Sequence, residues 1–329
     1  ICALSAVRGA GFAVLTVLGV LGALVGITLA RQRFRGRQLL LSLLTAILLQ
    51  VLSNLANDYG DAQSGVDDAS RTGPVRAVAS GLLTPDAMRR GMLLTGLAAA
   101  IAGLSLLFVA FGSDLRSWLV FVLLGAASLL AAITYTVGLG GKPYGYRGLG
   151  DVAVFVFFGL LGVLGTLYLH TQSLSGLAIL PAAVCGLLAT AVLNVNNVRD
   201  IHSDARHGKM TLAVRLGKRR AIYYHWALLG TALLLTLGYL LWLPVPWVGW
   251  SCLVVAKPLY DAGRTLSRTE DGEQLTGMLK KTALSTLVYS LLLAVGLAAW
   301  AVSGWSGRHR LDATVIVVTL LVIAAYRLV

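Results

Sequence analysis

Two short stretches carry acidic side chains at spacings that could bind a cation. The first, residues 54–61, has the pattern Asn-x-x-x-Asp-x-x-Asp and follows an apolar run that begins at Leu39. On a helix that turns about 100° per residue, Asn54, Asp58 and Asp61 fall within roughly 60° of one another. One amide and two carboxylates therefore share a face on which they can bind a common cation.

The second stretch, residues 196–204, has the related pattern Asn-x-x-x-Asp-x-x-x-Asp and follows an apolar run over residues 179–193. A continuous helix would again put Asn196, Asp200 and Asp204 on one face. Each stretch lies at the C-terminal end of an apolar helix, where the negative end of the helix dipole attracts cations. The sequence therefore predicts two metal sites or one shared pair.

Oxygen-only ligands indicate Mg²⁺ rather than zinc or copper, and Mg²⁺ is commonly held by a few carboxylates together with substrate phosphates. Basic residues follow both stretches and also occupy a loop between them, namely Arg71, Arg76, Arg147 and Lys209. Arginine binds phosphate oxygens in a bidentate manner. We therefore expect a diphosphate, which bound metal turns into a good leaving group.

A glycine-rich loop over residues 138–151 adds charge and aromatic rings. It contains Lys142, Tyr144 and Tyr146, and Tyr135 lies just before it. Glycines let the backbone approach a ligand closely, and tyrosine rings can face a carbocation formed when an allylic diphosphate leaves. By itself the signal is weak, because a turn with aromatic residues at a membrane interface has the same composition.

The elements that must position these residues are membrane helices. The chain is 57% hydrophobic and 12% charged, and its mean hydropathy is +0.80, whereas about a quarter of a typical soluble domain is charged. We therefore predict an all-α, polytopic bundle of nine to ten transmembrane helices in the lipid bilayer. The apolar windows are 10–30, 39–57, 91–111, 118–138, 152–169, 177–198, 222–243, 247–260, 282–302 and 311–327.

The net charge of +13 would suggest nucleic acid as a partner of a soluble protein, but here the basic residues sort by loop. Loops 58–90, 139–151, 199–221 and 257–281 hold most of the lysines and arginines. The positive-inside rule places these loops and both termini on the cytoplasmic side, and no nucleic-acid partner is expected. The arginines of residues 31–37 are an exception to this distribution.

The two acidic motifs on alternate helices resemble those of the UbiA superfamily of intramembrane aromatic prenyltransferases. Segments 52–61, 134–151 and 196–200 most resemble members that act on 1,4-dihydroxy-2-naphthoate in menaquinone synthesis, and the likeness covers about residues 40–300. It implies a bundle of the UbiA type, Mg²⁺ dependence, and transfer of a polyprenyl group from polyprenyl diphosphate to the naphthoate. The ring would lose its carboxylate and give demethylmenaquinone and diphosphate, in a bacterial inner membrane.

Carried over position by position, the resemblance assigns metal and diphosphate binding to the two acidic motifs and makes their four aspartates catalytic. The implied metal ligands are Asn54, Asp58, Asp61, Asn196, Asp200 and Asp204. The implied diphosphate-binding bases are Arg71, Arg76, Lys142, Arg147 and Lys209. The implied contacts to the carbocation or the acceptor are Asn57, Tyr135, Tyr144 and Tyr146.

The domain prediction is a single transmembrane prenyltransferase bundle over residues 1–302, with an additional C-terminal span in residues 303–329. The resemblance has no counterpart for this last span or for the arginine-rich loop at 31–37.

Two other functions are compatible with these residues. A sister aromatic prenyltransferase would use the same diphosphate site with another acceptor, because acceptor identity rests on the resemblance alone. An ion-coupled membrane transporter would also carry intramembrane acids, but such acids usually lie mid-span. The acids here lie at helix ends and are followed by arginines, which favours phosphate chemistry. Ion flux in proteoliposomes and prenyl transfer in detergent distinguish the two.

Overall fold

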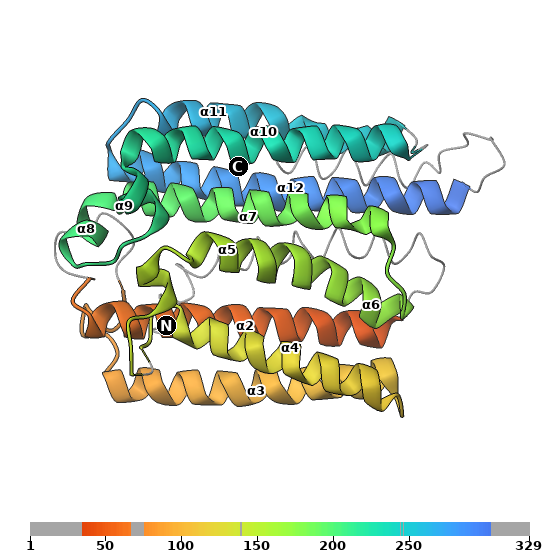
Figure 1. The fold of residues 1–329 in the computed structure, drawn as a ribbon, viewed down its shortest axis with the longest axis horizontal. Helices are drawn as coiled ribbons and strands as arrows, with labels where there is room; N and C mark the ends of the chain where they lie inside the picture. The colour runs from red at the N-terminus through yellow and green to blue at the C-terminus, as the bar shows by residue number, and fades with distance from the viewer. Residues whose placement is uncertain (1–34, 67–75, 139, 244, 246, 304–329) are drawn as a thin grey trace.

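The computed structural model describes residues 35–66, 76–138, 140–243, 245 and 247–303. Throughout these residues the regular structure is helical and no strand occurs (Figure 1). The helices run roughly antiparallel to one another, as expected for a chain that crosses a membrane repeatedly. The predicted all-α class is confirmed.

Among the described residues, seven helices are long and apolar enough to cross a bilayer. They are α2 (Gly36–Gln63), α3 (Pro85–Phe111), α4 (Leu115–Thr134), the continuous run of α5 (Gly150–Val154), η2 (Phe155–Gly165) and α6 (Thr166–Thr171), the run of η3 (Gly176–Ala178) and α7 (Ile179–Arg199), α10 (Lys218–Trp242), and α12 (Gly272–Ser303). The predicted spans at 10–30 and 311–327 lie outside the described residues, as does the proposed C-terminal addition.

Local capping explains where two of these helices begin. The Thr84 hydroxyl accepts a hydrogen bond from the backbone N–H of Ala87 at 3.2 Å, and Pro85 follows at the first helical position of α3. The Asp114 carboxylate accepts one from the backbone N–H of Ser117 at 3.3 Å at the start of α4. Both arrangements satisfy N–H groups that a helix start leaves without partners.

The region after α10 differs from the prediction. The window at 247–260 is not one continuous α-helix, because η4 (Trp247–Val255) is a 3₁₀ segment that leads into α11 (Ala256–Leu266). After α11, α12 begins at Gly272. With 32 residues, α12 is longer than the roughly 20 that span the hydrocarbon. Its charged first turns extend beyond the apolar belt instead of forming a separate element.

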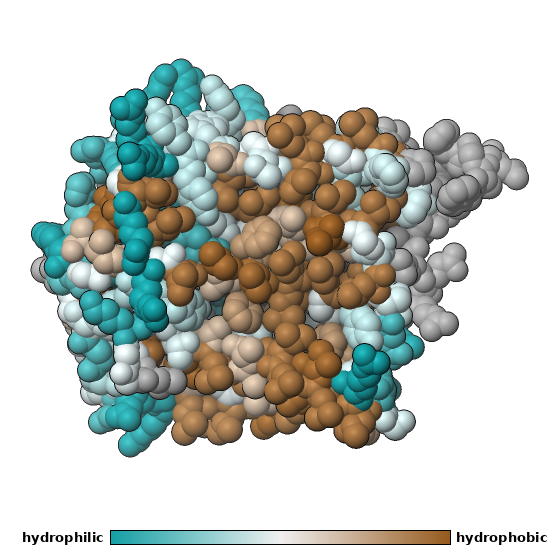
Figure 2. Space-filling model, viewed as in Figure 1, coloured by the Kyte–Doolittle hydropathy of each residue, from teal (hydrophilic) through white to brown (hydrophobic). Residues whose placement is uncertain are grey.

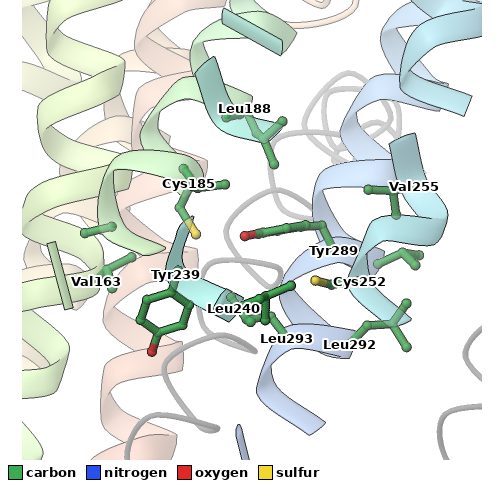
Figure 3. Close-up of a cluster of buried hydrophobic side chains, with 14 of the residues drawn as sticks. Val163, Cys185, Leu188, Tyr239, Leu240, Cys252, Val255, Tyr289, Leu292 and Leu293 are labelled. Atoms are coloured by element: carbon green, nitrogen blue, oxygen red, sulfur yellow. The ribbon is translucent and has the colours of Figure 1, made fainter. Parts of the chain in front are cut away.

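The core lies between α7, α10, η4 and α12. Figure 3 shows Cys185 and Leu188 of α7 facing Tyr289 of α12, with Cys252 of η4 beside them. The Tyr289 hydroxyl is 2.9 Å from the Thr236 hydroxyl of α10, which gives both of these buried polar groups a partner. By contrast, α4 buries only 6% of its apolar window and lies at the periphery.

Close contact between two glycines fixes the α5–η2–α6 segment against α7. A Cβ atom built at Gly159 would lie 2.6 Å from the Cα atom of Gly186, so neither helix could approach this closely with a larger residue. At the start of the same segment, the Thr190 hydroxyl donates to the backbone carbonyl of Asp151 at 3.4 Å. The beginning of α5 is therefore held beside α7.

The polar loops gather at one end of the bundle. That end carries the C-terminal ends of α2 and α7, the short helices η1 (Tyr144–Arg147), α8 (Ile201–Arg206) and α9 (Leu212–Leu216), and the starts of α10 and α12 (Figure 1). Figure 2 shows hydrophilic residues concentrated at this end, a hydrophobic belt across the middle of the visible face, and a few hydrophilic residues at the opposite end. The predicted sharing of one side by loops 58–90, 139–151, 199–221 and 257–281 agrees with this arrangement.

Candidate functional site

The first acidic motif lies in the last turns of α2, which continues as an α-helix to Gln63, as the spacing predicted. Asp58 and Asp61 are 3% and 1% exposed, although they lie at the polar end. A Cβ at Gly60 would lie 2.5 Å from the carbonyl oxygen of Thr136, so only glycine lets α2 pack this closely against the residues after α4. The Thr136 hydroxyl also donates to the Ala56 carbonyl at 2.8 Å.

Asp58 organises the loop that returns from α2 to α3. Its two carboxylate oxygens accept hydrogen bonds from the backbone N–H groups of Ala77 at 2.9 Å and Val78 at 3.1 Å. These bonds place the preceding residue, Arg76, next to the motif. With its amide turned so that both ends find partners, Asn57 accepts from Arg76 at 3.3 Å and donates to Asp61 at 2.8 Å. The predicted residues Asn57, Asp58, Asp61 and Arg76 thus form one connected group.

Asp61 joins the first motif to the second. Its carboxylate accepts a hydrogen bond from the Tyr146 hydroxyl at 2.7 Å and pairs with the Lys209 ammonium at 2.9 Å. The same ammonium is 4.0 Å from the Asp204 carboxylate, and it lies 5.4 Å from the centroid of the Tyr146 ring. Carboxylates from helices far apart in the sequence therefore share one buried cation.

The charge state of Lys209 follows from these neighbours. Burial alone would lower the pKa of its ammonium, but the charges of Asp61 and Asp204 outweigh burial and raise the pKa above its ordinary value of 10.5. Lys209 is therefore protonated at neutral pH. Burial, together with the charge of Asp61, also raises the pKa of Tyr146, so its hydroxyl remains a hydrogen-bond donor.

The second motif is not the continuous helix that the spacing suggested. α7 ends at Arg199, Asp200 takes φ −93° and ψ 9°, and α8 starts at Ile201. Nevertheless Asp200 and Asp204 are 8% and 3% exposed, and both lie at the same end of the bundle as Asp58 and Asp61. The break changes the direction of the chain without separating the two motifs.

Arg199 contacts the second motif, although the sequence analysis did not select it. Its guanidinium donates to both carboxylate oxygens of Asp200, at 2.8 and 2.7 Å, and to the amide oxygen of Asn196 at 2.8 Å. This bidentate geometry is the one in which arginine binds carboxylates most specifically. The available signal was its position, next to Asp200 and one helical turn after Asn196.

Of the predicted tyrosines, Tyr146 contacts Asp61 directly, whereas Tyr135 and Tyr144 pack against each other. The rings of Tyr135 and Tyr144 meet edge to face with centroids 5.5 Å apart, and the Tyr144 hydroxyl donates to the Ala131 carbonyl at 2.9 Å. Burial raises the pKa of Tyr144 to about 12. Burial raises the pKa of Tyr135 further, as do the charges of Asp61, Asp204 and Asp151. Both hydroxyl groups therefore stay protonated, and Tyr135 is the one of the two that lies within electrostatic reach of the acids.

Three further predicted residues are less closely connected. The Asn54 amide donates to the Gln50 carbonyl of its own helix at 3.0 Å and is half-buried. Lys142 and Arg147 have exposed side chains, so the structure does not bring them into the buried acid cluster. Arg71 lies outside the described residues.

The donor set fits a hard divalent cation whose coordination is completed by a ligand. Among the described residues, no three acidic, histidine or cysteine side chains converge closely enough to hold an ion by themselves. The two motifs nevertheless offer only oxygen donors, and a cation, the Lys209 ammonium, already lies between Asp61 and Asp204. Mg²⁺ is typically held by one or two carboxylates plus phosphate oxygens, which is the chemistry that this arrangement offers.

Comparison with known proteins places the whole arrangement in context. Residues 19–279 match the model of the UbiA prenyltransferase family. The chain is 47% identical to the 1,4-dihydroxy-2-naphthoate octaprenyltransferase of Escherichia coli K12, over 80% of this chain and 85% of that protein. It is 42% identical to the protein of the same name from Haemophilus influenzae, over 84% of this chain and 89% of that protein.

Solved structures share the fold. A UbiA homolog from Aeropyrum pernix K1 in its apo form superposes with a TM-score of 0.63 at 16% identity, covering 85% of this chain and 96% of that chain. A UbiA homolog from Archaeoglobus fulgidus, solved bound to DMAPP and Mg²⁺, superposes with a TM-score of 0.60 at 13% identity, covering 89% of this chain and 99% of that chain.

Proposed function

The chain belongs to the UbiA prenyltransferase family, and from this premise we propose that it transfers a polyprenyl group from polyprenyl diphosphate to 1,4-dihydroxy-2-naphthoate. The bond between the allylic carbon and the diphosphate oxygen breaks, and that carbon bonds to the ring carbon bearing the carboxylate. The carboxylate leaves as CO₂ and its bonding electron pair returns to the ring. The products are diphosphate and demethylmenaquinone in its reduced, hydroquinone form.

The observation that carries this proposal is the meeting of the two acidic motifs at Lys209. Basic side chains among acids at the polar end of an apolar bundle, Arg76 and Lys209, suit a substrate with a metal-bound anionic head and a hydrocarbon chain. The names of relatives at 47% and 42% identity support dihydroxynaphthoate as the acceptor.

The diphosphate is held at the polar end by Arg76 and Lys209 together with the aspartates of both motifs. Asp58, Asp61, Asp200 and Asp204 would hold Mg²⁺ through carboxylate oxygens, with Asn54 and Asn196 as neighbouring amide donors. When bound, the ion supplies positive charge that makes diphosphate a better leaving group. Asp58 holds the loop that carries Arg76, and Arg199 holds the carboxylate of Asp200. Both residues therefore maintain the geometry of this site.

The reacting carbon lies next to the diphosphate, so the groups just below the acids surround it. The rings of Tyr135, Tyr144 and Tyr146 offer electron-rich faces to a developing carbocation, and Asn57 lies between Arg76 and Asp61. These packed rings also exclude water, which would otherwise capture the cation. Arg71, Lys142 and Arg147 complete the basic surroundings through which the diphosphate enters.

The protein is integral to a membrane, as its seven membrane-length helices indicate within the described residues. We place it in a bacterial inner membrane with the active-site loops facing the cytoplasm, because those loops carry most of the positive charge. Residues 1–302 would form the prenyltransferase bundle, and residues 303–329 would add a C-terminal span.

The direct test incubates the purified full chain with dihydroxynaphthoate, a polyprenyl diphosphate and Mg²⁺ and identifies products by mass. The expected product is the prenylated, decarboxylated ring, formed only with the divalent ion. Replacing the acceptor by 4-hydroxybenzoate should reduce the rate strongly. Equal rates with the two acceptors would remove the naphthoate assignment and leave a prenyltransferase of another acceptor class.

A further inference from the structure

One buried carboxylate at this end of the bundle has no role in holding the diphosphate. Asp151 lies in the first turn of α5 and is 4% exposed. Neither of its carboxylate oxygens accepts a hydrogen bond of good geometry, although the Tyr224 hydroxyl of α10 is close enough to interact with the carboxyl. A charged group buried without a donor is costly, so this position calls for an explanation.

The surroundings of Asp151 connect it to the proposed site. The preceding residue, Gly150, packs on Tyr135, since a Cβ built at Gly150 would lie 3.0 Å from a ring carbon and 3.3 Å from the hydroxyl of that tyrosine. Tyr135 in turn interacts electrostatically with Asp61, Asp204 and Asp151. Tyr135 therefore packs on the residue before Asp151 and lies within electrostatic reach of Asp151 and of one carboxylate from each acidic motif.

Asp151 also lies deeper in the bundle than the diphosphate-binding groups. Its backbone carbonyl contacts the Thr190 hydroxyl, and Thr190 precedes Asn196 by six positions along α7. On an α-helix six positions span about 9 Å. The backbone of Asp151 therefore contacts α7 about 9 Å further from the polar end than Asn196, on the side of the acidic motifs where the hydrocarbon end of the substrate would lie.

We propose that Asp151 binds the aromatic acceptor by accepting a hydrogen bond from one of its ring hydroxyl groups. This inference rests on the proposed function and assigns its acceptor site. The ring would lie against Tyr135, whose face suits stacking or edge contact with another aromatic ring. A hydrogen bond from a phenolic hydroxyl to a carboxylate is charge-assisted, and it increases electron density in the ring. The acceptor would therefore be both positioned and made more nucleophilic.

The test measures acceptor binding and turnover in the purified full chain carrying Asp151→Asn. The variant keeps the size of the side chain and removes its charge. We expect its Kd for dihydroxynaphthoate, measured by calorimetry, to rise about tenfold or more, because hydrogen bonds to charged groups are the strong ones. The KM for polyprenyl diphosphate should stay unchanged. Asp86→Asn is the matched control, since Asp86 also lies in the first turn of a membrane helix but is exposed.

Monomethyl ethers of the acceptor separate recognition from a merely structural role. Wild-type protein should bind one of the two ethers about tenfold more weakly than the free diol, whereas Asp151→Asn should discriminate far less between that ether and the diol. Equal wild-type affinities for the diol and both ethers would overturn the inference, even if the variant does not fold. An unchanged acceptor Kd in a folded Asp151→Asn variant would overturn it as well.

The outcomes also keep this inference apart from the proposed function. If wild-type protein binds dihydroxynaphthoate and discriminates between the ethers but forms no prenylated product, the transfer reaction fails while the Asp151 site stands. If wild-type protein forms the product and the variant matches it in acceptor Kd, the reaction stands and the Asp151 site fails.

Discussion

The two acidic motifs have nearly the same pattern but are neutralised in different ways. In the first, Asp58 is bound by backbone N–H groups about twenty positions away, and Asp61 is bound by Tyr146 and Lys209, still more distant in the sequence. In the second, Asp200 is held by the adjacent Arg199, and the helix breaks at that point. The first motif depends on tertiary contacts, whereas the second carries its main counter-charge with it.

Because of this difference, mutations of the two motifs should have different effects on the stability of the protein and on its catalytic activity. Removing a partner of the first motif should disturb the junction of several loops, because Asp61 links α2, η1 and the loop after α8. Removing Arg199 should disturb one carboxylate and leave that junction intact.

The largest effect is expected from the carboxylates themselves. Asp61→Asn and Asp200→Asn should each lower kcat/KM by about a thousandfold or more. Each variant loses a carboxylate that would hold Mg²⁺, and the positive charge of that ion stabilises the leaving diphosphate. Product formation by mass over an Mg²⁺ titration measures this. Substantial Mg²⁺-dependent activity in either folded variant would contradict the role proposed for the carboxylate of that motif.

Lys209→Gln should be the more damaging of the two counter-charge substitutions. It leaves Asp61 buried without its cation, so the free energy of unfolding should fall by about 3–5 kcal/mol, read as a lower denaturation midpoint in detergent. The double variant Lys209→Gln/Asp61→Asn should recover part of that stability and none of the activity. Absence of recovery would mean that Lys209 stabilises the bundle through other contacts.

Arg199→Lys tests the second motif. Lysine keeps the charge but cannot form the bidentate contact with Asp200 while also reaching Asn196. We expect about a tenfold loss of kcat at nearly unchanged thermal stability, measured in parallel by turnover and by thermal denaturation. A loss of stability as large as that of Lys209→Gln would contradict the distinction between the motifs.

The pH dependence of stability sharpens the account of Lys209. Folding raises the pKa of this group, so its contribution is fully present below the ordinary value of 10.5 and is lost as the pH rises through the folded pKa. The difference in stability between wild type and Lys209→Gln should therefore be constant from about pH 7 to about pH 9 and shrink only at more alkaline pH. A difference that disappears near neutrality would show that the carboxylate neighbours of Lys209 do not stabilise its ammonium in the folded protein.

The smallest effect is expected at the exposed bases of the glycine-rich loop. Lys142→Ala and Arg147→Ala should raise the KM for polyprenyl diphosphate by only about two- to threefold, because exposed charges interact weakly through solvent. The effect should decrease further at high salt. A loss as large as that of Lys209→Gln would indicate that the loop closes over the diphosphate.

Much of the candidate site could be predicted because placing a carboxylate in or near the hydrocarbon of a membrane costs free energy. Asp58, Asp61, Asp200 and Asp204 stand out against apolar runs, and their spacing identifies a common chemistry. Arg199 and Asp151 lie within the segments that carried the family resemblance, but no spacing assigned either of them a role. A basic residue at the end of a helix and an acid after a glycine are ordinary, and only their burial and contacts single them out.

The sequence by itself determined that this chain is a helical membrane protein with two oxygen-donor motifs at helix ends, because hydropathy and helical periodicity are local properties. Only the tertiary structure decided which acid meets which base. Lys209 pairs with Asp61, more than a hundred positions away, since packing around Gly60, Thr136 and Tyr146 brings the loops to one point. The tertiary structure also decided the helix break at Asp200. There the Arg199 guanidinium binds both Asp200 and Asn196 and holds the end of α7.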